Sequence, residues 1–202
     1  LHSHHAQALG KPRWGDKSLH TEHYTHQLFH EFPNAKILHM TRDPRDRYAS
    51  VKKRHGRTVN RVGASLGRWL YSMRAAYRNL EQYPQNYRIV TYEQLASQPQ
   101  QTLQQVFDFL GEQFTPDALS MAGAAGYRES GGNSSFEKIE PGVISTKSIG
   151  RFRQVLDQRE ISYIQMFAGA EMEKLGYLKE PISFPSSEKF TFLGELPINV
   201  AR

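Results

Sequence analysis

The stretch ILHMTRDPRD at residues 37–46 decides the fold of this chain. The mostly apolar residues 35–41 predict a short buried strand, and a helix is expected to begin at Pro44. Pro44 lacks the backbone N–H that would be unpaired in a first helical turn, and Asp43 is a favoured N-cap residue. Arg42 therefore stands between a strand end and a helix N-terminus. Its guanidinium and the unpaired backbone N–H groups of that helix predict an anion-binding site.

A hydroxyl and further cations follow this stretch. Ser50 lies eight residues after Arg42, about two helical turns along, and can contact an anion that lies on the same helix face. The alternative is that the Arg/Asp cluster only fixes the helix start at the surface. The basic side chains of residues 42–61 fit either a solvated helix face or a surface for an anionic acceptor such as an acidic glycan. They are Arg42, Arg45, Arg47, Lys52, Lys53, Arg54, Arg57 and Arg61.

The order of the remaining elements predicts an α/β fold. Hydrophobic periodicity indicates helices over residues 21–32, from 44 onward, 62–82, from 99 to about 110 and 157–175, and strands over 35–41 and 87–92. Strands that alternate with helices are typical of parallel pairing with right-handed crossovers. Trp69 and Met73 lie on the apolar stripe of the longest helix and are expected in the core.

Length and composition fit one domain with an anionic ligand. The 202 residues carry a net charge of +6 and an isoelectric point near 9.5. No cysteine is present, which excludes disulfides and thiol catalysis and favours a reducing, cytoplasmic compartment. No apolar run is long enough to span a membrane. We expect a single domain over 1–202, a flexible acceptor or lid loop over 122–149, and a C-terminal extension over 178–202.

Several motifs, in chain order, resemble those of the sulfotransferases that use 3′-phosphoadenosine 5′-phosphosulfate (PAPS). Residues 14–18 (WGDKS) are similar to the lysine-bearing segment of that family, and residues 42–50 to its 3′-phosphate-binding segment. Residues 90–95 (VTYEQL) resemble its second strand and Y-E-x-L motif. Residues 148–153 (SIGRFR) resemble its late loop. The resemblance implies a P-loop-NTPase-like fold with a three-layer arrangement, in which a parallel sheet is flanked by helices.

The resemblance also implies a cofactor and roles for individual residues. The donor would be PAPS, the product adenosine 3′,5′-bisphosphate, and no metal would be required. Lys17 matches the catalytic lysine, with a solvated surface lysine as the alternative. Tyr92 matches a residue on the adenine side, with a core tyrosine at a strand end as the alternative. The residues expected to bind the nucleotide are Arg42, Ser50, Tyr92, Lys147, Arg151 and Arg153. Arg151 and Arg153 could instead pair with acidic surface.

The general base is open on the sequence alone. Soluble members of the family have a histidine two residues after the lysine, but Leu19 stands there in this chain. His20, whose ordinary pKa lies near the working pH, and Asp16 are the candidates, together with a residue upstream of Leu1. No metal site is expected, because His20, His23 and His30 are not at a metal-ligand spacing and no acidic or cysteine partner completes a site with them.

One motif of the family is absent from the sequence. The Gly/Ser/Thr-rich loop that cradles the 5′-phosphosulfate is not found, and we expect it, with a central strand, before Leu1. The acceptor would be a small molecule, glycan or peptide. We expect no nucleic acid partner and a protein of prokaryotic type, and a membrane anchor before Leu1 stays open. The alternatives are a P-loop nucleotide or small-molecule kinase and a non-catalytic basic module that binds nucleic acid or another anion.

Overall fold

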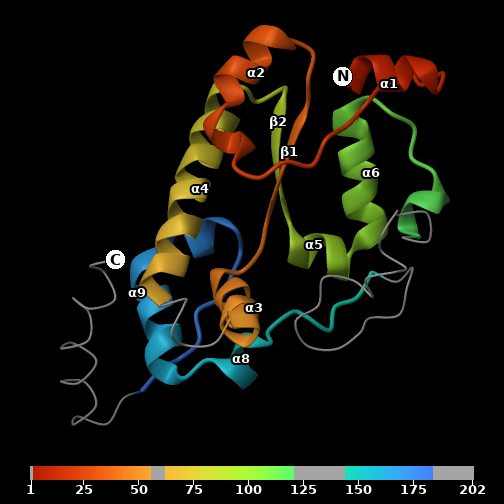
Figure 1. Cartoon of the computed structure of the whole chain (residues 1–202). Coiled ribbons are helices and arrows are strands. Elements are labelled where there is room, and N and C mark those ends of the chain that lie inside the picture. Colours follow the sequence, from red (N-terminus) through yellow and green to blue (C-terminus); the bar gives the residue numbers. More distant parts are fainter. Residues whose placement is uncertain (1, 56–61, 121–143, 184–202) are drawn as a thin grey trace.

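The computed structural model describes residues 2–55, 62–120 and 144–183 (Figure 1). Two strands, β1 (Ile37–Thr41) and β2 (Tyr87–Thr91), form a parallel sheet in which Ile37 is opposite Tyr87 and Thr41 opposite Thr91. The helices around it are α1 (His2–Ala8), η1 (Thr21–His23), α2 (Thr25–Glu31), α3 (Pro44–His55), α4 (Val62–Gln82), α5 (Tyr92–Ser97), α6 (Pro99–Leu110), η2 (Pro116–Leu119), α8 (Phe152–Val155) and α9 (Gln158–Lys174). The predicted α/β class and the parallel pairing are confirmed.

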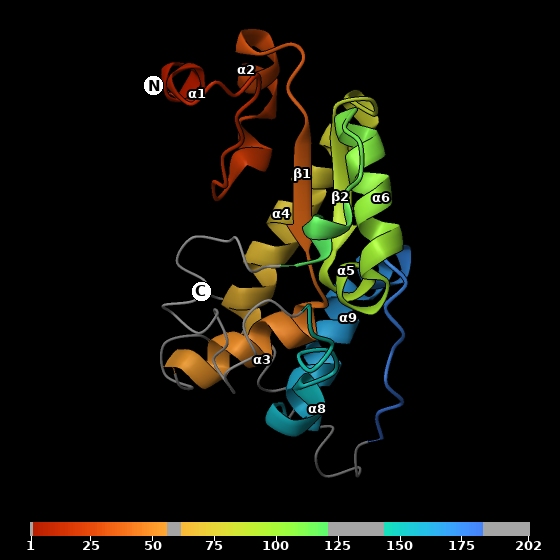
Figure 2. The same ribbon diagram turned by 90° about the vertical axis from the view of Figure 1, so that its right-hand side faces the viewer.

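The core lies between the sheet and two long helices that pack side by side, α4 and α9 (Figures 1 and 2). Trp69 and Met73 of α4 are buried, as the apolar stripe predicts, and Met73 is fully covered. Ile164 and Met172 of α9 are fully covered as well. Burying each such side chain stabilises the fold by about 1.5–3 kcal/mol. This packing fixes the position of the sheet and of the segments that leave its carboxyl end.

The helix predicted over residues 21–32 is divided in the structure. Thr21–His23 form the 3-10 helix η1, and α2 begins only at Thr25. Asn79 of α4 explains the division, because its side-chain amide donates to the carbonyl oxygen of Glu22 at 2.7 Å and to the Thr25 hydroxyl at 2.9 Å. A continuous helix would use the Glu22 carbonyl internally.

Both ends of the helix predicted over 157–175 are confirmed by α9. Asp157 is its N-cap and forms a capping box with Glu160. Gly176 ends the helix in the left-handed conformation, with φ of 78°, and the Tyr177 N–H donates to the Met172 carbonyl at 2.9 Å. The helices α1, α5 and α8 were not predicted. In α5 the signal was available, since Thr91 and Gln94 form a capping box directly after β2.

The two irregular regions are only partly described. The loop predicted over 122–149 lies outside the described residues up to position 143, as does the C-terminal extension from 184 onward. The described part of the extension runs beside α9, where the Glu180 N–H donates to the Gln165 side chain at 2.8 Å. Within the described ranges, no helix is long and apolar enough to cross a membrane.

Candidate functional site

Arg42, at the carboxyl end of β1, is where three predicted ligand-binding segments meet. Its guanidinium donates to the Ser148 carbonyl at 2.8 Å and lies 4.9 Å from the centre of the Tyr92 ring. The Tyr92 hydroxyl in turn donates to the Ser145 carbonyl at 2.8 Å. These segments are separated by about 50 residues of sequence or more. The side chain of Arg42 remains 25% exposed, so the group has access to solvent.

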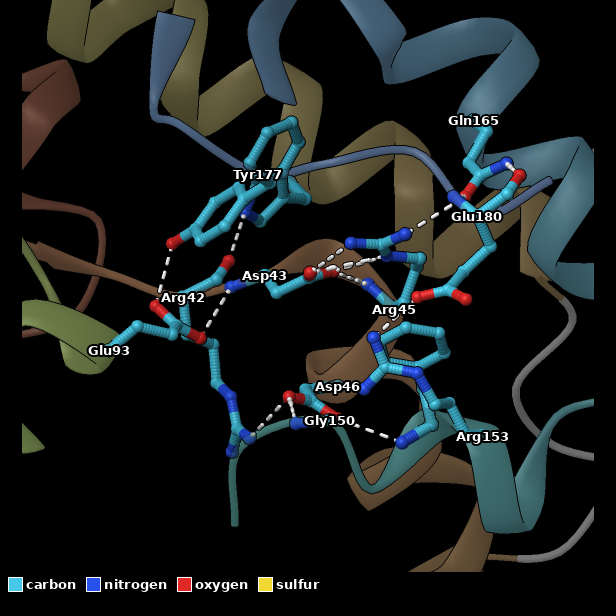
Figure 3. Close-up of polar contacts among 12 residues, drawn as sticks. Arg42, Asp43, Arg45, Asp46, Glu93, Gly150, Arg153, Gln165, Tyr177 and Glu180 are labelled. Atoms are coloured by element: carbon cyan, nitrogen blue, oxygen red, sulfur yellow. Dashed lines mark hydrogen bonds and ion pairs between the residues drawn. The ribbon is translucent and has the colours of Figure 1, made fainter. Parts of the chain in front are cut away.

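The backbone around Arg42 is held by buried hydrogen bonds (Figure 3). The indole N–H of Trp69 donates to the Arg42 carbonyl at 3.1 Å. Glu93 accepts the Asp43 N–H at 3.0 Å and the Tyr177 hydroxyl at 2.7 Å. Burial raises the pKa of Glu93 above its ordinary value, although both donors and Arg42 oppose that shift. The strand end is therefore fixed from α4, from α5 and from the segment after α9.

Asp43 caps α3 as predicted, and this limits the anion site. Its carboxylate accepts the Arg45 N–H at 2.8 Å and the Arg45 guanidinium at 2.6 Å (Figure 3). Arg45 is 3% exposed, donates to Gln165 at 2.8 Å and lies 4.3 Å from the centre of the Phe152 ring. One of the helix N–H groups expected to bind an anion is therefore taken by Asp43. Asp43 and Arg45 therefore fix the start of α3, which is the alternative to anion binding. The Arg42 side chain points away from this pair (Figure 3).

Asp46 joins α3 to the late loop. Its carboxylate accepts the Gly150 N–H at 2.7 Å and the Phe152 N–H at 2.8 Å, and it lies 3.6 Å from the Arg42 guanidinium. Burial raises the pKa of Asp46, and the two N–H donors and Arg42 oppose this. Gly150 has φ of 73°, and a Cβ there would lie 2.3 Å from an Arg153 side-chain nitrogen. The left-handed backbone therefore favours glycine at this turn, whereas the Arg153 side chain could shift to make room.

The predicted cations of the late loop do not all face Arg42. Lys147 is exposed, and its carbonyl accepts the Arg151 side chain at 2.6 Å. Both residues flank Ser148, which is bound to Arg42. Arg153 instead pairs with Glu180 and lies over the Phe152 ring. Of the three, Lys147 and Arg151 stay beside the Arg42 group, and Arg153 takes the alternative role of pairing with an acidic residue.

Ser50 is half-buried on α3, four residues after Asp46 and therefore on the same helix face. This agrees with the spacing argument that placed Ser50 along the face that begins at Arg42. Arg42, which precedes α3, and Ser50 thus follow one side of that helix, and between them lies the Asp46 carboxylate, which accepts two backbone N–H groups.

The basic residues of the stretch 42–61 were expected to form either a solvated helix face or a surface for an anionic acceptor. For several of them both expectations are wrong. Arg45 is buried in its ion pair, and the Arg47 guanidinium donates to the Ser65 carbonyl and hydroxyl, both at 2.9 Å. Lys52 forms a half-buried ion pair with Glu160 at 2.6 Å. These three cations connect α3 to its neighbours, so neither a solvated face nor an acceptor surface describes them. Arg57 and Arg61 lie outside the described residues.

The segment with the predicted catalytic lysine is exposed. Lys17, Asp16 and His20 are all solvent-accessible, and Asp16 accepts a hydrogen bond from the Ser18 hydroxyl. His20 has a left-handed backbone, with φ of 66°, and precedes η1. In Figure 2 the segment between α1 and η1 lies on the same side of β1 as α3, which lies beyond the strand's carboxyl end.

Four structural residues of this site were not identified from the sequence. Asp46, Glu93, Trp69 and Tyr177 hold the Arg42 region but have no ligand-like spacing. Glu93 lies within the VTYEQL segment and Tyr177 lies two residues after the helix predicted over 157–175, but the sequence does not indicate their partners. Their contacts span as many as 106 residues of sequence, which no local pattern indicates.

Comparison with known proteins identifies the fold and the family. A solved structure titled "Sulfotransferase Domain from the Curacin Biosynthetic Pathway" is similar in fold, with a TM-score of 0.58 and 21% sequence identity over 88% of this chain and 68% of that one. The family model described as "Sulfotransferase family" matches residues 2–116, more than half of the chain and the part that contains the lysine segment, β1, α3 and β2. The chain therefore belongs to the sulfotransferase family.

Proposed function

We propose that this sulfotransferase transfers a sulfuryl group from PAPS to a hydroxyl or amine of a small molecule, glycan or peptide acceptor. The observation that carries the proposal is the convergence on Arg42 of Tyr92 and the late loop at Ser148. A guanidinium, an aromatic ring and nearby cations suit a nucleotide that carries a phosphate on its ribose. Membership of the sulfotransferase family favours this function over the kinase and the non-catalytic binding module.

In this proposal Arg42 and Ser50 hold the 3′-phosphate, with Tyr92 on the adenine side. Arg42 keeps donor capacity for a ligand, because its side chain is 25% exposed and its Nε has no hydrogen-bond partner among the described residues. A phosphate oxygen would satisfy such a group, which is costly to leave unpaired. Lys147 and Arg151 add positive charge beside the Ser148 contact. The 3′-phosphate would thus sit at the end of β1, held mainly by side chains.

Lys17 would act on the reacting atoms. During transfer a bond forms between the acceptor oxygen or nitrogen and sulfur, and the bond from sulfur to the bridging phosphate oxygen breaks. Adenosine 3′,5′-bisphosphate leaves with the electron pair, and the acceptor proton passes to a base. An ammonium beside the bridging oxygen stabilises the charge that develops there. His20 and Asp16, which flank Lys17 in an exposed segment, both remain candidates for the base.

We also infer that the domain has the three-layer arrangement of its family. The two faces of β2 support this inference, since Tyr87 belongs to the core formed with α4 and α9. The next residue, Arg88, donates to the Gln105 side chain of α6 at 3.1 Å. Successive strand residues point to opposite faces, so helices cover the sheet on both sides. Further strands and the phosphosulfate-binding loop remain predictions.

A binding comparison tests the nucleotide assignment. Adenosine 3′,5′-bisphosphate should raise the thermal midpoint of the protein and bind at least tenfold more tightly than AMP, by roughly the value of one charge-assisted contact. Both titrations should be made by calorimetry in the presence of a chelator, because no metal is needed. Equal affinity for the two nucleotides would contradict the 3′-phosphate site.

A further inference from the structure

A second group of ligand-type side chains surrounds η1, apart from Arg42. His20, Glu22 and His23 each direct one ligand atom into a common space, and these atoms all lie within 4.8 Å of one another. From this geometry we propose that the three residues bind a divalent transition metal ion of the zinc class. No metal site was expected from the sequence, and Glu22 supplies the acidic partner that the two histidines lacked in that prediction.

The carboxylate of the group is held in place before any ion binds. Glu22 Oε1 accepts the Ser72 hydroxyl at 2.6 Å, and the Asn79 amide donates to the Glu22 carbonyl at 2.7 Å. Both donors belong to α4, a long helix with seven buried residues. The Glu22 side chain is only 9% exposed, so the surrounding residues restrict its movement. A hydrogen bond of this kind to a ligating carboxylate is typical of metal sites.

The two histidines contribute one fixed and one adjustable ligand. The His23 ring is stacked on Tyr71, with 4.3 Å between ring centres, and its Nε2 lies 3.7 Å from Glu22 Oε1. His20 is exposed and directly precedes η1, with a left-handed backbone. Exposure leaves its side chain able to rotate onto an ion that the other two ligands already hold.

The ligand set and its spacing suit zinc chemistry. Two imidazoles and one carboxylate are a familiar zinc set that leaves a fourth position open. With bonds near 2.0–2.1 Å, tetrahedral ligands lie about 3.4 Å apart. The observed limit of 4.8 Å exceeds this by at most about 1.4 Å, which rotation of His20 can close. Glu22 would partly neutralise the ion, and neutral imidazoles would supply the remaining bonds.

The neighbouring residues distinguish this group from other histidines of the chain. His30 also has a carboxylate close by, with 3.4 Å to Glu31, but both side chains are more than 70% exposed and no third ligand from the described residues joins them. His4 and His5 of α1 are exposed and have no acidic residue in the first turn of their helix. The His20, Glu22 and His23 group is therefore the candidate that combines three ligands with a buried anchor.

Metal titration of the full chain tests the proposal directly. The background should carry His2→Ala, His4→Ala and His5→Ala, because three histidines near the N-terminus could bind metal ions on their own. Calorimetry with Zn²⁺ and visible absorption of bound Co²⁺ should show one ion per chain. Zn²⁺ should also raise the thermal midpoint of this background. Absence of binding in the background would overturn the proposal.

Variants of the three ligands and a matched control make the test specific. Glu22→Gln keeps the shape of the side chain and should weaken Zn²⁺ binding by at least about tenfold, as should His23→Ala. Ser72→Ala removes only the hydrogen bond to Glu22 and should cause a smaller loss. His30→Ala should leave binding unchanged. If Glu22→Gln and His23→Ala bind Zn²⁺ as tightly as His30→Ala, the pair at 3.7 Å is only an ion pair and the proposal is wrong.

These measurements do not depend on the nucleotide site. Binding of adenosine 3′,5′-bisphosphate to Glu22→Gln checks that this variant is folded. Loss of metal binding with retained nucleotide binding supports the metal site alone. Retained metal binding without nucleotide binding would instead contradict the proposed cofactor and leave the metal site intact.

Discussion

The Asp46 carboxylate accepts the backbone N–H of Gly150 at 2.7 Å, across 104 residues of sequence. This contact fixes the late loop against α3, so that Ser148 reaches the Arg42 guanidinium. The carboxylate is almost fully buried, with a side chain 1% exposed, and it also accepts the Phe152 N–H. One side chain therefore connects the two halves of the proposed nucleotide site.

Replacing Asp46 should cost stability as well as binding. Asn offers one acceptor oxygen where Asp46 has two, so Asp46→Asn leaves a loop N–H facing an amide NH₂ group. We expect a loss of about 1–3 kcal/mol in the free energy of unfolding, measured by urea denaturation. Asp108→Asn, at an exposed position of α6, removes the same charge and should change little. Equal effects of the two substitutions would contradict the role of Asp46.

The two 3′-phosphate ligands should differ in their effect on affinity. Arg42→Ala removes charge-assisted hydrogen bonds and should weaken binding of adenosine 3′,5′-bisphosphate by roughly 10- to 100-fold. Ser50→Ala removes one neutral hydroxyl and should cost about tenfold or less. Arg74→Ala, on the exposed side of α4, also lowers the net charge by one and serves as the control. A loss in Arg74→Ala as large as in Arg42→Ala would indicate attraction by net charge only.

Lys17 should affect turnover more than nucleotide binding. A group that stabilises charge only in the transition state lowers kcat when removed, and Lys17→Ala should reduce kcat by about a hundredfold or more. Lys11→Ala is a suitable control, since this lysine is exposed nearby. If Lys17→Ala loses nucleotide affinity to the same extent as turnover, the lysine anchors the nucleotide and does not act on the reacting atoms.

Single substitutions should identify the base. If His20 accepts the acceptor proton, His20→Ala should lower kcat by about 10²- to 10⁴-fold, while Asp16→Asn, which keeps its contact with Ser18, stays close to wild type. The opposite pattern would assign the proton to Asp16. Assays should contain a chelator and be repeated with Glu22→Gln, so that loss of a metal ligand is not mistaken for loss of the base. If neither substitution lowers kcat, both candidates are wrong.

Burial of Glu93 predicts a specific dependence of stability on pH. The pKa of Glu93 is raised above its ordinary value of 4.5, chiefly by burial. Between that ordinary value and the raised one, the folded protein holds a proton that the unfolded chain has released. The free energy of unfolding therefore falls as pH rises through this interval. Relative to Glu93→Gln, the wild type should lose stability over that range in urea unfolding. A difference that is constant or increases with pH would contradict the raised pKa.

The sequence alone determined both strands, most of the long helices and the chemistry of single positions. Local signals identified the strand that ends at Arg42, the helix that begins at Pro44 and the end of α9 at Gly176, because capping and backbone preferences act over a few residues. They also selected Arg42, and the resemblance to the PAPS-dependent sulfotransferases added Tyr92 and the late loop, which the structure brings together with it.

Only the tertiary structure determines the partners of the charged side chains that follow Arg42 in the sequence. The sequence predicts surface positions for Arg45, Arg47 and Lys52. In the structure, each of them is paired with a group from a distant element. The sequence predicts one helix over residues 21–32, but Asn79 divides it. The Glu22 carboxylate is held by Ser72 of the same distant helix and lies close to His20 and His23. Burial and partner identity depend on which distant segments pack together, and side-chain spacing along the chain carries no information on that.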